Sequence, residues 1–187
     1  MVLKTERLTL RPWRESDAKD LYRYAKDERV GPIAGWPPHK SVEESLEVIQ
    51  TVFSQEWVFA VTLKEEDLAI GCVGLILGEN SNFSINDDEG EISYWICVPF
   101  WGKGYIPEAI REVLRYGFED LKLTNIWCGY FDGNEKSKRA QEKCGFRYHH
   151  TEPAKHYELI NDIRIEQVSC ITRQEWEELA KNDTDRK

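Results

Sequence analysis

Residues 91–117 read EISYWICVPFWGKGYIPEAIREVLRYG and join an expected strand, a loop with two glycines and the start of a helix. Aromatic and β-branched side chains in residues 91–98 predict the strand. Gly102 and Gly104 allow a tight turn, and Pro107 is tolerated in the first turn of a helix. A strand that leads into a helix N-terminus gathers unpaired N–H groups at the positive end of the helix dipole. The stretch therefore predicts an anion site of the kind that binds pyrophosphate.

The chain has 187 residues and 41% hydrophobic content, which is enough for one well-filled core and short for two domains. We expect a single domain over residues 1–180 and a flexible polar tail over residues 181–187. No run of about 18 apolar residues occurs, and the N-terminus lacks the basic and apolar regions of a signal peptide. These features predict a cytoplasmic protein without a membrane segment.

The formal net charge is −9, which argues against general nucleic-acid binding because a polyanion partner needs a basic face. Residues 99–150 nevertheless carry more Lys and Arg than Asp and Glu, while the rest of the chain is strongly acidic. This distribution favours an anionic cofactor on the basic segment and a cationic substrate elsewhere. The five cysteines form no CxxC pair and lie mostly in apolar runs, which predicts reduced, buried thiols.

Periodicity along the rest of the chain predicts a mixed order of helices and strands. Strands are expected at residues 7–13, 57–63, 69–77, 91–98, 124–131, 146–150 and 163–171. Helices are expected to begin near Ser16, Ser41, Gly104, Asn134 and Thr172. Two loops, residues 31–39 and 78–90, are candidates for the rim of a substrate pocket. The simpler alternatives are that Trp36 staples the first loop to the core and that the second is a solvated acidic loop.

Two common nucleotide-binding motifs are excluded around the glycine loop. A Walker loop needs Ser or Thr after its Gly-Lys pair, and Lys103 is followed by Gly104. A Rossmann fingerprint needs a third glycine where Pro107 stands. The remaining interpretation is a pyrophosphate loop of another type.

Two separate motifs carry a resemblance to a known family. Residues 94–110 (YWICVPFWGKGYIPEAI) and 134–146 (NEKSKRAQEKCGF) together resemble the GNAT acetyltransferase superfamily, and specifically its RimJ/RimL-like branch. Residues 7–22 and 171–179 fit that branch too, so the resemblance covers nearly the whole chain. It implies a single α/β (α+β) domain with a mixed, mostly antiparallel sheet. The central strands at residues 91–98 and 124–131 would run roughly parallel and splay apart.

The cleft between those strands would hold acetyl-CoA, according to the resemblance. The pantetheine amides would pair, as an added strand does, with the backbone of Ile96, Cys97 and Val98. The pyrophosphate would bind at the start of the helix. Its partners there would be the backbone N–H groups of Gly102, Lys103, Gly104, Tyr105 and Ile106.

Four further side chains are assigned to the same cofactor. Asn134 would hold the pantetheine arm, and Ser137, one turn later, would lie near the thioester sulfur. Lys103 and Lys143 would supply positive charge to the phosphates. The alternative for both lysines is a solvated surface position, which we favour for Lys143.

The expected reaction needs a base, because a protonated amine is not a nucleophile. Glu91 is our candidate, since it opens the central strand beside the acidic loop, and burial against Tyr94, Trp95 and Phe100 would suit that role. The alternative is a strand-end carboxylate paired with a lysine. A backbone N–H on the side of Cys97 and Val98 would meet the oxyanion. Ser137, or else Tyr130, would protonate the leaving thiolate, and Ser137 is preferred because its motif matches residue by residue.

Other reactive side chains are given no role. Cys97 has no histidine close in sequence and has apolar neighbours, so we interpret it as core rather than as a nucleophile. His149, His150 and His156 lack a cysteine or carboxylate at ligand spacing, and no metal is expected. The chain departs from the family pattern at Ile106, where a small residue is usual, and at Ser93, where glycine is usual.

The sequence therefore predicts an acetyl-CoA-dependent N-acetyltransferase. It would acetylate a primary amine, either a protein N-terminus or a small-molecule amine, by direct attack in a ternary complex. The alternative is a non-catalytic module that senses acyl-CoA, and a structural domain that has lost the cofactor is disfavoured by the retained motifs. The protein is expected to be a monomer or a homodimer.

Overall fold

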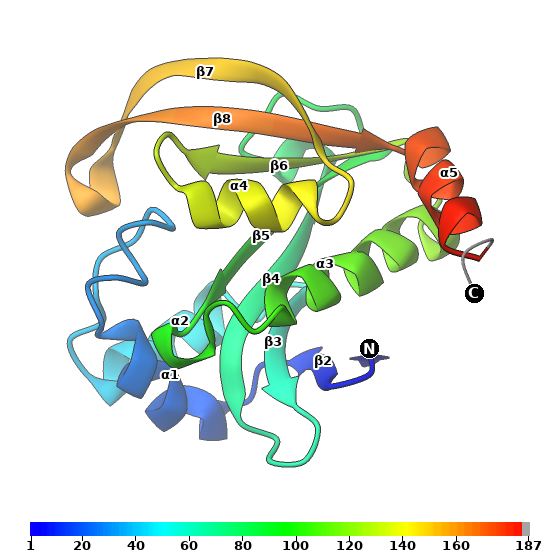
Figure 1. Cartoon of the computed structure of the whole chain (residues 1–187). Coiled ribbons are helices and arrows are strands. Elements are labelled where there is room, and N and C mark those ends of the chain that lie inside the picture. Colours follow the sequence, from blue (N-terminus) through cyan, green and yellow to red (C-terminus); the bar gives the residue numbers. More distant parts are fainter. Residues whose placement is uncertain (185–187) are drawn as a thin grey trace.

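One eight-stranded sheet runs through the computed structural model, which describes residues 1–184 (Figure 1). Its spatial order is β1-β2-β3-β4-β5-β6-β8-β7. The strands are β1 (Leu3–Lys4), β2 (Leu8–Pro12), β3 (Val58–Leu63), β4 (Ala69–Leu77), β5 (Glu89–Ile96), β6 (Asn125–Phe131), β7 (Arg147–Tyr157) and β8 (Asp162–Thr172). The helices are α1 (Ala18–Ala25), α2 (Val42–Thr51), α3 (Tyr105–Arg115), α4 (Glu135–Glu142) and α5 (Arg173–Thr184).

The sheet is antiparallel except between β5 and β6, which run parallel. These two strands pair only at their first residues, and the last pair joins Glu91 to Trp127. β5 then continues to Ile96 and β6 to Phe131 without pairing to each other. The predicted parallel pair that splays apart is therefore confirmed.

Helices cover both faces of the sheet (Figure 1). On one face, α3 buries Ile110, Val113 and Leu114 against strand residues such as Ile92 and Ile126. On the other face, α1 and α2 form a second apolar cluster with residues of β3 and β4. The alternation of side chains along β3 and β4 supplies both clusters, since successive residues point to opposite faces.

Several element bounds differ from the sequence-based expectations. β1 was missed because two residues give no readable alternation. β7 continues past Pro153 to Tyr157, since two register irregularities against β8 accommodate the change of direction. Ser16 does not cap α1, because it lies within a 3-10 turn and the Asp17 carboxylate accepts the Arg14 N–H.

The C-terminal helix is longer than expected. α5 continues through Thr184, although residues 181–187 were assigned to a flexible tail. Lys181 and its polar neighbours tolerate a helical backbone in the last turn, where a cation also faces the negative end of the helix dipole. Residues 185–187 lie outside the described part of the chain.

Candidate active site

A cavity of about 840 Å³ opens where β5 and β6 separate. Its walls come from β5, the loop that leads into α3, β6, α4, the β7–β8 hairpin and residues 33–35. It brings together most of the predicted site residues, namely Glu91, Ile96, Gly102, Gly104, Tyr105, Ile106, Asn134 and Ser137. Cys97, Val98 and Lys103 do not line it.

The backbone of β5 explains which of its groups face this cavity. The Cys97 N–H donates to the Ile70 carbonyl of β4 at 2.9 Å. Backbone groups alternate in direction along a strand, so those of Ile96 point the other way, into the splay. This corrects the prediction for Cys97, whose N–H is already used within the sheet and is not free for pantetheine or for an oxyanion. The Ile96 carbonyl accepts the Trp101 indole N–H at 2.8 Å and keeps a second lone pair.

The loop before α3 has the backbone conformation that its glycines predict. Gly102 and Gly104 have φ angles of 73° and 80°, in the left-handed region that side chains disfavour. Gly104 is the N-cap of α3, so the N–H groups of Tyr105 and Ile106 lie in a first turn that offers them no intrahelical acceptor. These groups, at the positive end of the helix, suit a phosphate.

A clamp of side chains, defined by Thr5, Arg7 and Glu108, supports this loop and was not found from the sequence. The Glu108 carboxylate accepts the Arg7 N–H at 2.8 Å and the Arg7 Nε at 2.7 Å, and Thr5 also donates to it. Arg7 Nη1 donates to the Lys103 carbonyl at 3.0 Å, and its guanidinium lies 4.6 Å from the centre of the Tyr105 ring. Partial burial opposes ionisation, yet the hydrogen bonds from Thr5 and Arg7 lower the pKa of Glu108.

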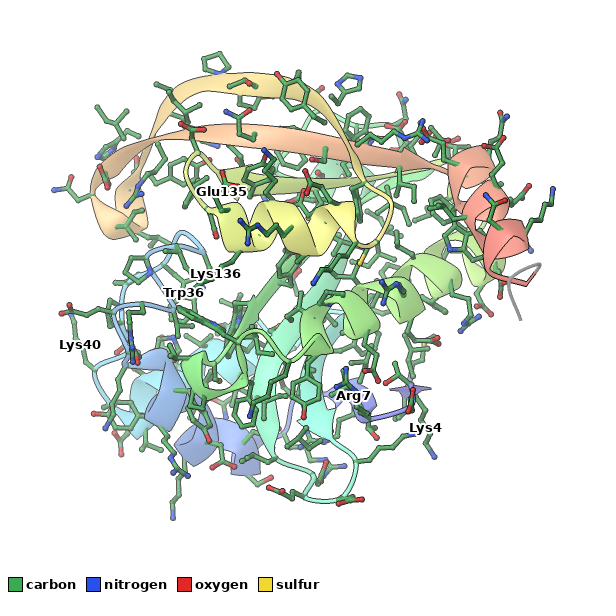
Figure 2. The ribbon with its side chains drawn as sticks, in the orientation of Figure 1. Lys4, Arg7, Trp36, Lys40, Glu135 and Lys136 are labelled. Carbon is green, nitrogen blue, oxygen red and sulfur yellow. The ribbon has the colours of Figure 1, made fainter. Side chains whose placement is uncertain are left out.

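A second contact crosses the mouth of the cavity. Lys136 Nζ, at the start of α4, lies 3.5 Å from the centre of the Trp101 ring. Figure 2 shows Lys136 on the lower side of α4 and Arg7 below α3, so the loop before α3 is braced from two directions. Arg139 and Lys143 also line the cavity from α4, which makes this side basic.

Ser137 is held by hydrogen bonds from two sides. Asn134 Oδ1 accepts the Ser137 N–H at 3.2 Å, which confirms the predicted cap of α4. The Tyr94 hydroxyl lies 2.7 Å from Ser137 Oγ and 3.1 Å from the Ser137 carbonyl. Burial raises the pKa of Tyr94, so its proton is retained. This pairing was not predicted from the sequence, because Tyr94 and Ser137 are 43 residues apart.

Glu91 is buried, with 5% of its surface exposed, and it lines the cavity. Its carboxylate accepts hydrogen bonds from Ser81 Oγ at 2.7 Å and from both the N–H and the side-chain amide of Asn82. In residues 1–184 no lysine or arginine forms an ion pair with it, contrary to the alternative considered for a strand-end carboxylate. Residues 81–82 of the loop after β4 therefore bind Glu91, while Asp87 and Asp88 of the same loop are exposed to solvent.

The loop at residues 31–39 fulfils both expectations for it. Trp36 packs against Trp95 of β5, with ring centres 5.7 Å apart. Ala34 and Gly35 line the cavity. Figure 2 shows Trp36 on the loop that lies opposite the start of α4. One tryptophan thus anchors a loop whose backbone forms part of the rim.

The other reactive side chains take no part in this arrangement. The Cys97 thiol is 1% exposed and burial raises its pKa, which agrees with its interpretation as core. Among residues 1–184, no group of three or more His, Cys, Asp and Glu side chains is placed to hold a metal ion. The described helices include none with the length and apolarity to cross a bilayer.

Comparison of this chain with known proteins finds a matching family and individual relatives. The family model described as "Acetyltransferase (GNAT) domain" matches residues 7–147. The uncharacterized N-acetyltransferase p20 of Bacillus licheniformis is 33% identical over 129 residues, which cover 66% of this chain and 70% of that protein.

Solved structures share the fold. A GNAT-family acetyltransferase from Bacillus anthracis superposes with a TM-score of 0.80 and 23% identity, covering 93% of this chain and 99% of that chain. The ribosomal-protein-S5-alanine acetyltransferase of Vibrio fischeri superposes with a TM-score of 0.70 and 20% identity, covering 94% and 98% of the two chains.

Proposed function

Because the chain belongs to the GNAT acetyltransferase family, in its RimJ/RimL-type branch, we propose that it acetylates a primary amine by direct attack within a ternary complex. Membership makes it an acetyl-CoA-dependent N-acetyltransferase. The observation that carries the proposal is that Ile96, the glycine loop, Asn134 and Ser137 all line one cavity. When bound, acetyl-CoA supplies a thioester whose carbonyl carbon an amine can attack.

The residues present fit this cosubstrate. The Ile96 backbone points into the splay, as an added peptide-like arm would need. The N–H groups at Gly104, Tyr105 and Ile106 would hold the pyrophosphate, and the side-chain amide of Asn134 is left to donate, since only its oxygen caps α4. The oxyanion donor expected near Cys97 and Val98 is not carried into this proposal, because the Cys97 N–H is bound to Ile70 and Val98 does not line the cavity.

Ser137 would give a proton to the leaving thiolate. If the Tyr94 hydroxyl donates to Ser137 Oγ, the Ser137 hydroxyl proton is free to point toward the sulfur. The Tyr94 proton stays in place because burial raises its pKa. Tyr94 is therefore a positioning residue that orients Ser137, and Ser137 is the group that touches the reacting atoms.

Glu91 would take the proton of the amine, directly or through a water molecule. Its position beside the splay and its place in the cavity wall support this role. Hydrogen bonds from Ser81 and Asn82 keep its carboxylate in one orientation. A protein N-terminus is our first candidate for the acceptor, because one structural neighbour is the ribosomal-protein-S5-alanine acetyltransferase of Vibrio fischeri.

Release of free CoA thiol from acetyl-CoA in the presence of a panel of amines and N-terminal peptides tests the proposal. We expect turnover with at least one acceptor, and a loss of about 100-fold in kcat/KM in Glu91→Gln, the usual scale for a lost general base. Glu89→Gln is the matched control, because Glu89 is a buried carboxylate on the same strand and does not line the cavity.

Two results would contradict it. Stabilisation by acetyl-CoA without any thiol release would favour the non-catalytic sensor. Equal activity of Glu91→Gln and the wild type would remove Glu91 as the base and leave the family assignment untouched.

A further inference from the structure

Glu166 lines the same cavity from β8. The register places it opposite Phe131 of β6, and Glu91 is paired with Trp127 of the same strand. Paired residues share a sheet face and alternate residues along a strand return to it. Glu91, Gly129 and Glu166 therefore lie on one face, with a glycine between the two carboxylates.

Gly129 is what admits the Glu166 carboxylate. A Cβ at this position would overlap Glu166 Oε1 and would also come within 2.8 Å of the Phe83 ring. The other oxygen, Oε2, accepts the Tyr157 hydroxyl at 2.8 Å. Within residues 1–184, Oε1 receives no hydrogen bond and no cation forms an ion pair with Glu166. Oε2 is thus held by Tyr157, while Oε1 lies over Gly129 of the cavity wall without a hydrogen-bond partner among residues 1–184.

Lys155 and Arg164 lie near Glu166, against the rings of Tyr157 and Phe131, but within residues 1–184 neither forms an ion pair with it. Burial raises the pKa of Glu166, and the negative charges of Glu91 and Glu152 act in the same direction. The hydrogen bond from Tyr157 and the charge of Lys155 oppose that shift without cancelling it. Aromatic rings of Phe131 and Tyr157, which meet edge to face at 4.8 Å, form the wall beside it. An approaching ammonium group would complement this end of the cavity.

Glu91 is held by a different loop, and its Oε1 keeps a lone pair for the proton of the amine. Both of its oxygens already accept hydrogen bonds from Ser81 and Asn82. Residues 33–35 and the β7–β8 hairpin line the same cavity as Glu166, and Figure 1 shows the loop at residues 31–39 facing the tip of this hairpin.

We propose that Glu166 binds the ammonium group of the acceptor through Oε1 and so restricts acceptors to cationic primary amines. This inference rests on the proposed acetyl transfer and adds an acceptor-binding residue to it. Tyr157 holds the carboxylate in place, and Gly129 provides its space. The amine would lose its proton only after it has been placed between Glu166 and Glu91.

Steady-state kinetics with an alanine-initiated hexapeptide and with 1,4-diaminobutane test this at saturating acetyl-CoA. We expect Glu166→Gln to raise the KM of both amines by about tenfold or more, the range for a lost hydrogen bond to a charged group. The KM of acetyl-CoA stays unchanged. Gly129→Ala, which fills the space of Oε1, moves the amine KM in the same direction.

Glu152→Gln is the matched control, because Glu152 faces Glu166 across β7 and β8 but does not line the cavity. An unchanged amine KM in Glu166→Gln overturns the inference, as does an equal rise in Glu152→Gln. Calorimetric titration of 1,4-diaminobutane with CoA present gives a readout that needs no turnover. Weaker binding in Glu166→Gln supports the inference even if the wild type transfers no acetyl group, and equal or undetectable binding to the wild type and the variant overturns it.

Discussion

The wall made by β5, the loop at residues 97–104 and α3, here the cofactor wall, comes from one continuous stretch of chain and acts largely through its backbone. The facing wall, made by β6, α4 and the β7–β8 hairpin, is here called the acceptor wall after the role proposed for Glu166, although α4 also carries Asn134 and Ser137; it would act through side chains from separate elements. On the first, Gly102 and Gly104 set the direction of N–H groups. On the second, Glu166 needs Gly129 and Tyr157 from two other strands.

This difference shows how each half is specified. Backbone groups are the same in every residue, so the cofactor wall depends on conformation, which glycine and helix-start signals encode locally. The acceptor wall depends on which side chains meet, and register decides that over long sequence separations. The two halves are joined by the Tyr94–Ser137 hydrogen bond.

Removing the Tyr94–Ser137 hydrogen bond from the Ser137 side should have the largest effect on kcat. Ser137→Ala removes the proposed proton donor, and we expect kcat to fall by about 100-fold with little change in the KM of acetyl-CoA. Tyr94→Phe should lower kcat less, since Ser137 keeps its hydroxyl. Initial rates of thiol release at saturating substrates measure both. A Ser137→Ala variant with wild-type kcat would show that the thiolate leaves without this group.

Loosening the cofactor wall alone should give an intermediate effect. Glu108→Gln weakens the clamp from Thr5 and Arg7, so the loop at residues 102–104 is less well ordered before binding. We expect the KM of acetyl-CoA to rise by about tenfold, on the scale of one charge-assisted hydrogen bond, and the amine KM to remain unchanged. Titration of each substrate at saturation of the other separates the two. A rise confined to the amine KM would contradict the assignment of this clamp to the cofactor wall.

The smallest expected effect is on the free energy of unfolding. Its pH dependence should have opposite signs for Glu108 on the cofactor wall and Glu166 on the acceptor wall. The pKa of Glu108 is lowered in the folded state, so its contribution to stability is complete above the ordinary value of 4.5 and is lost as the pH falls through the lowered pKa. The pKa of Glu166 is raised, so stability falls as the pH rises from 4.5 through that raised pKa.

Thermal melts of the two glutamine variants therefore move in opposite directions at pH 7. We expect Glu108→Gln to lower Tm by about 2–4 °C, which corresponds to roughly 1 kcal/mol after allowance for the exposure of Arg7. Glu166→Gln should leave Tm unchanged or raise it. Below the lowered pKa of Glu108 the difference between that variant and the wild type should vanish. Matching shifts in both variants across pH would mean that the two carboxylates have the same structural role.

The sequence was sufficient for the features that a few adjacent residues determine. The glycine turn, the start of α3 and the Asn134 cap were predicted from local chemistry. The splay of β5 and β6 was predicted from the family resemblance and is confirmed. The Cys97 N–H was misassigned, because which side of a strand a backbone group faces depends on the partner strand.

Contacts between distant residues could not be predicted in the same way. Arg7 and Glu108 are 101 residues apart, and neither local sequence indicates that the two side chains are in contact. Tyr157 and Glu166 are only nine residues apart, but their contact lies in a hairpin whose register shifts twice between β7 and β8, and no local pattern indicates those shifts. A single-residue shift of register would turn such side chains to the opposite face. The acceptor wall is therefore the part that needed the structure.

The β7–β8 hairpin has a consequence for how this protein can change over evolution. The hairpin begins at Arg147, where the match to the family model ends, and within residues 1–184 it pairs with the rest of the sheet through β6 alone. Substitutions near its tip can alter the shape and charge of the entrance while the loop at residues 102–104 stays the same. Grafting this hairpin between relatives would thus be a direct route to enzymes that keep one acyl donor and acquire new acceptors.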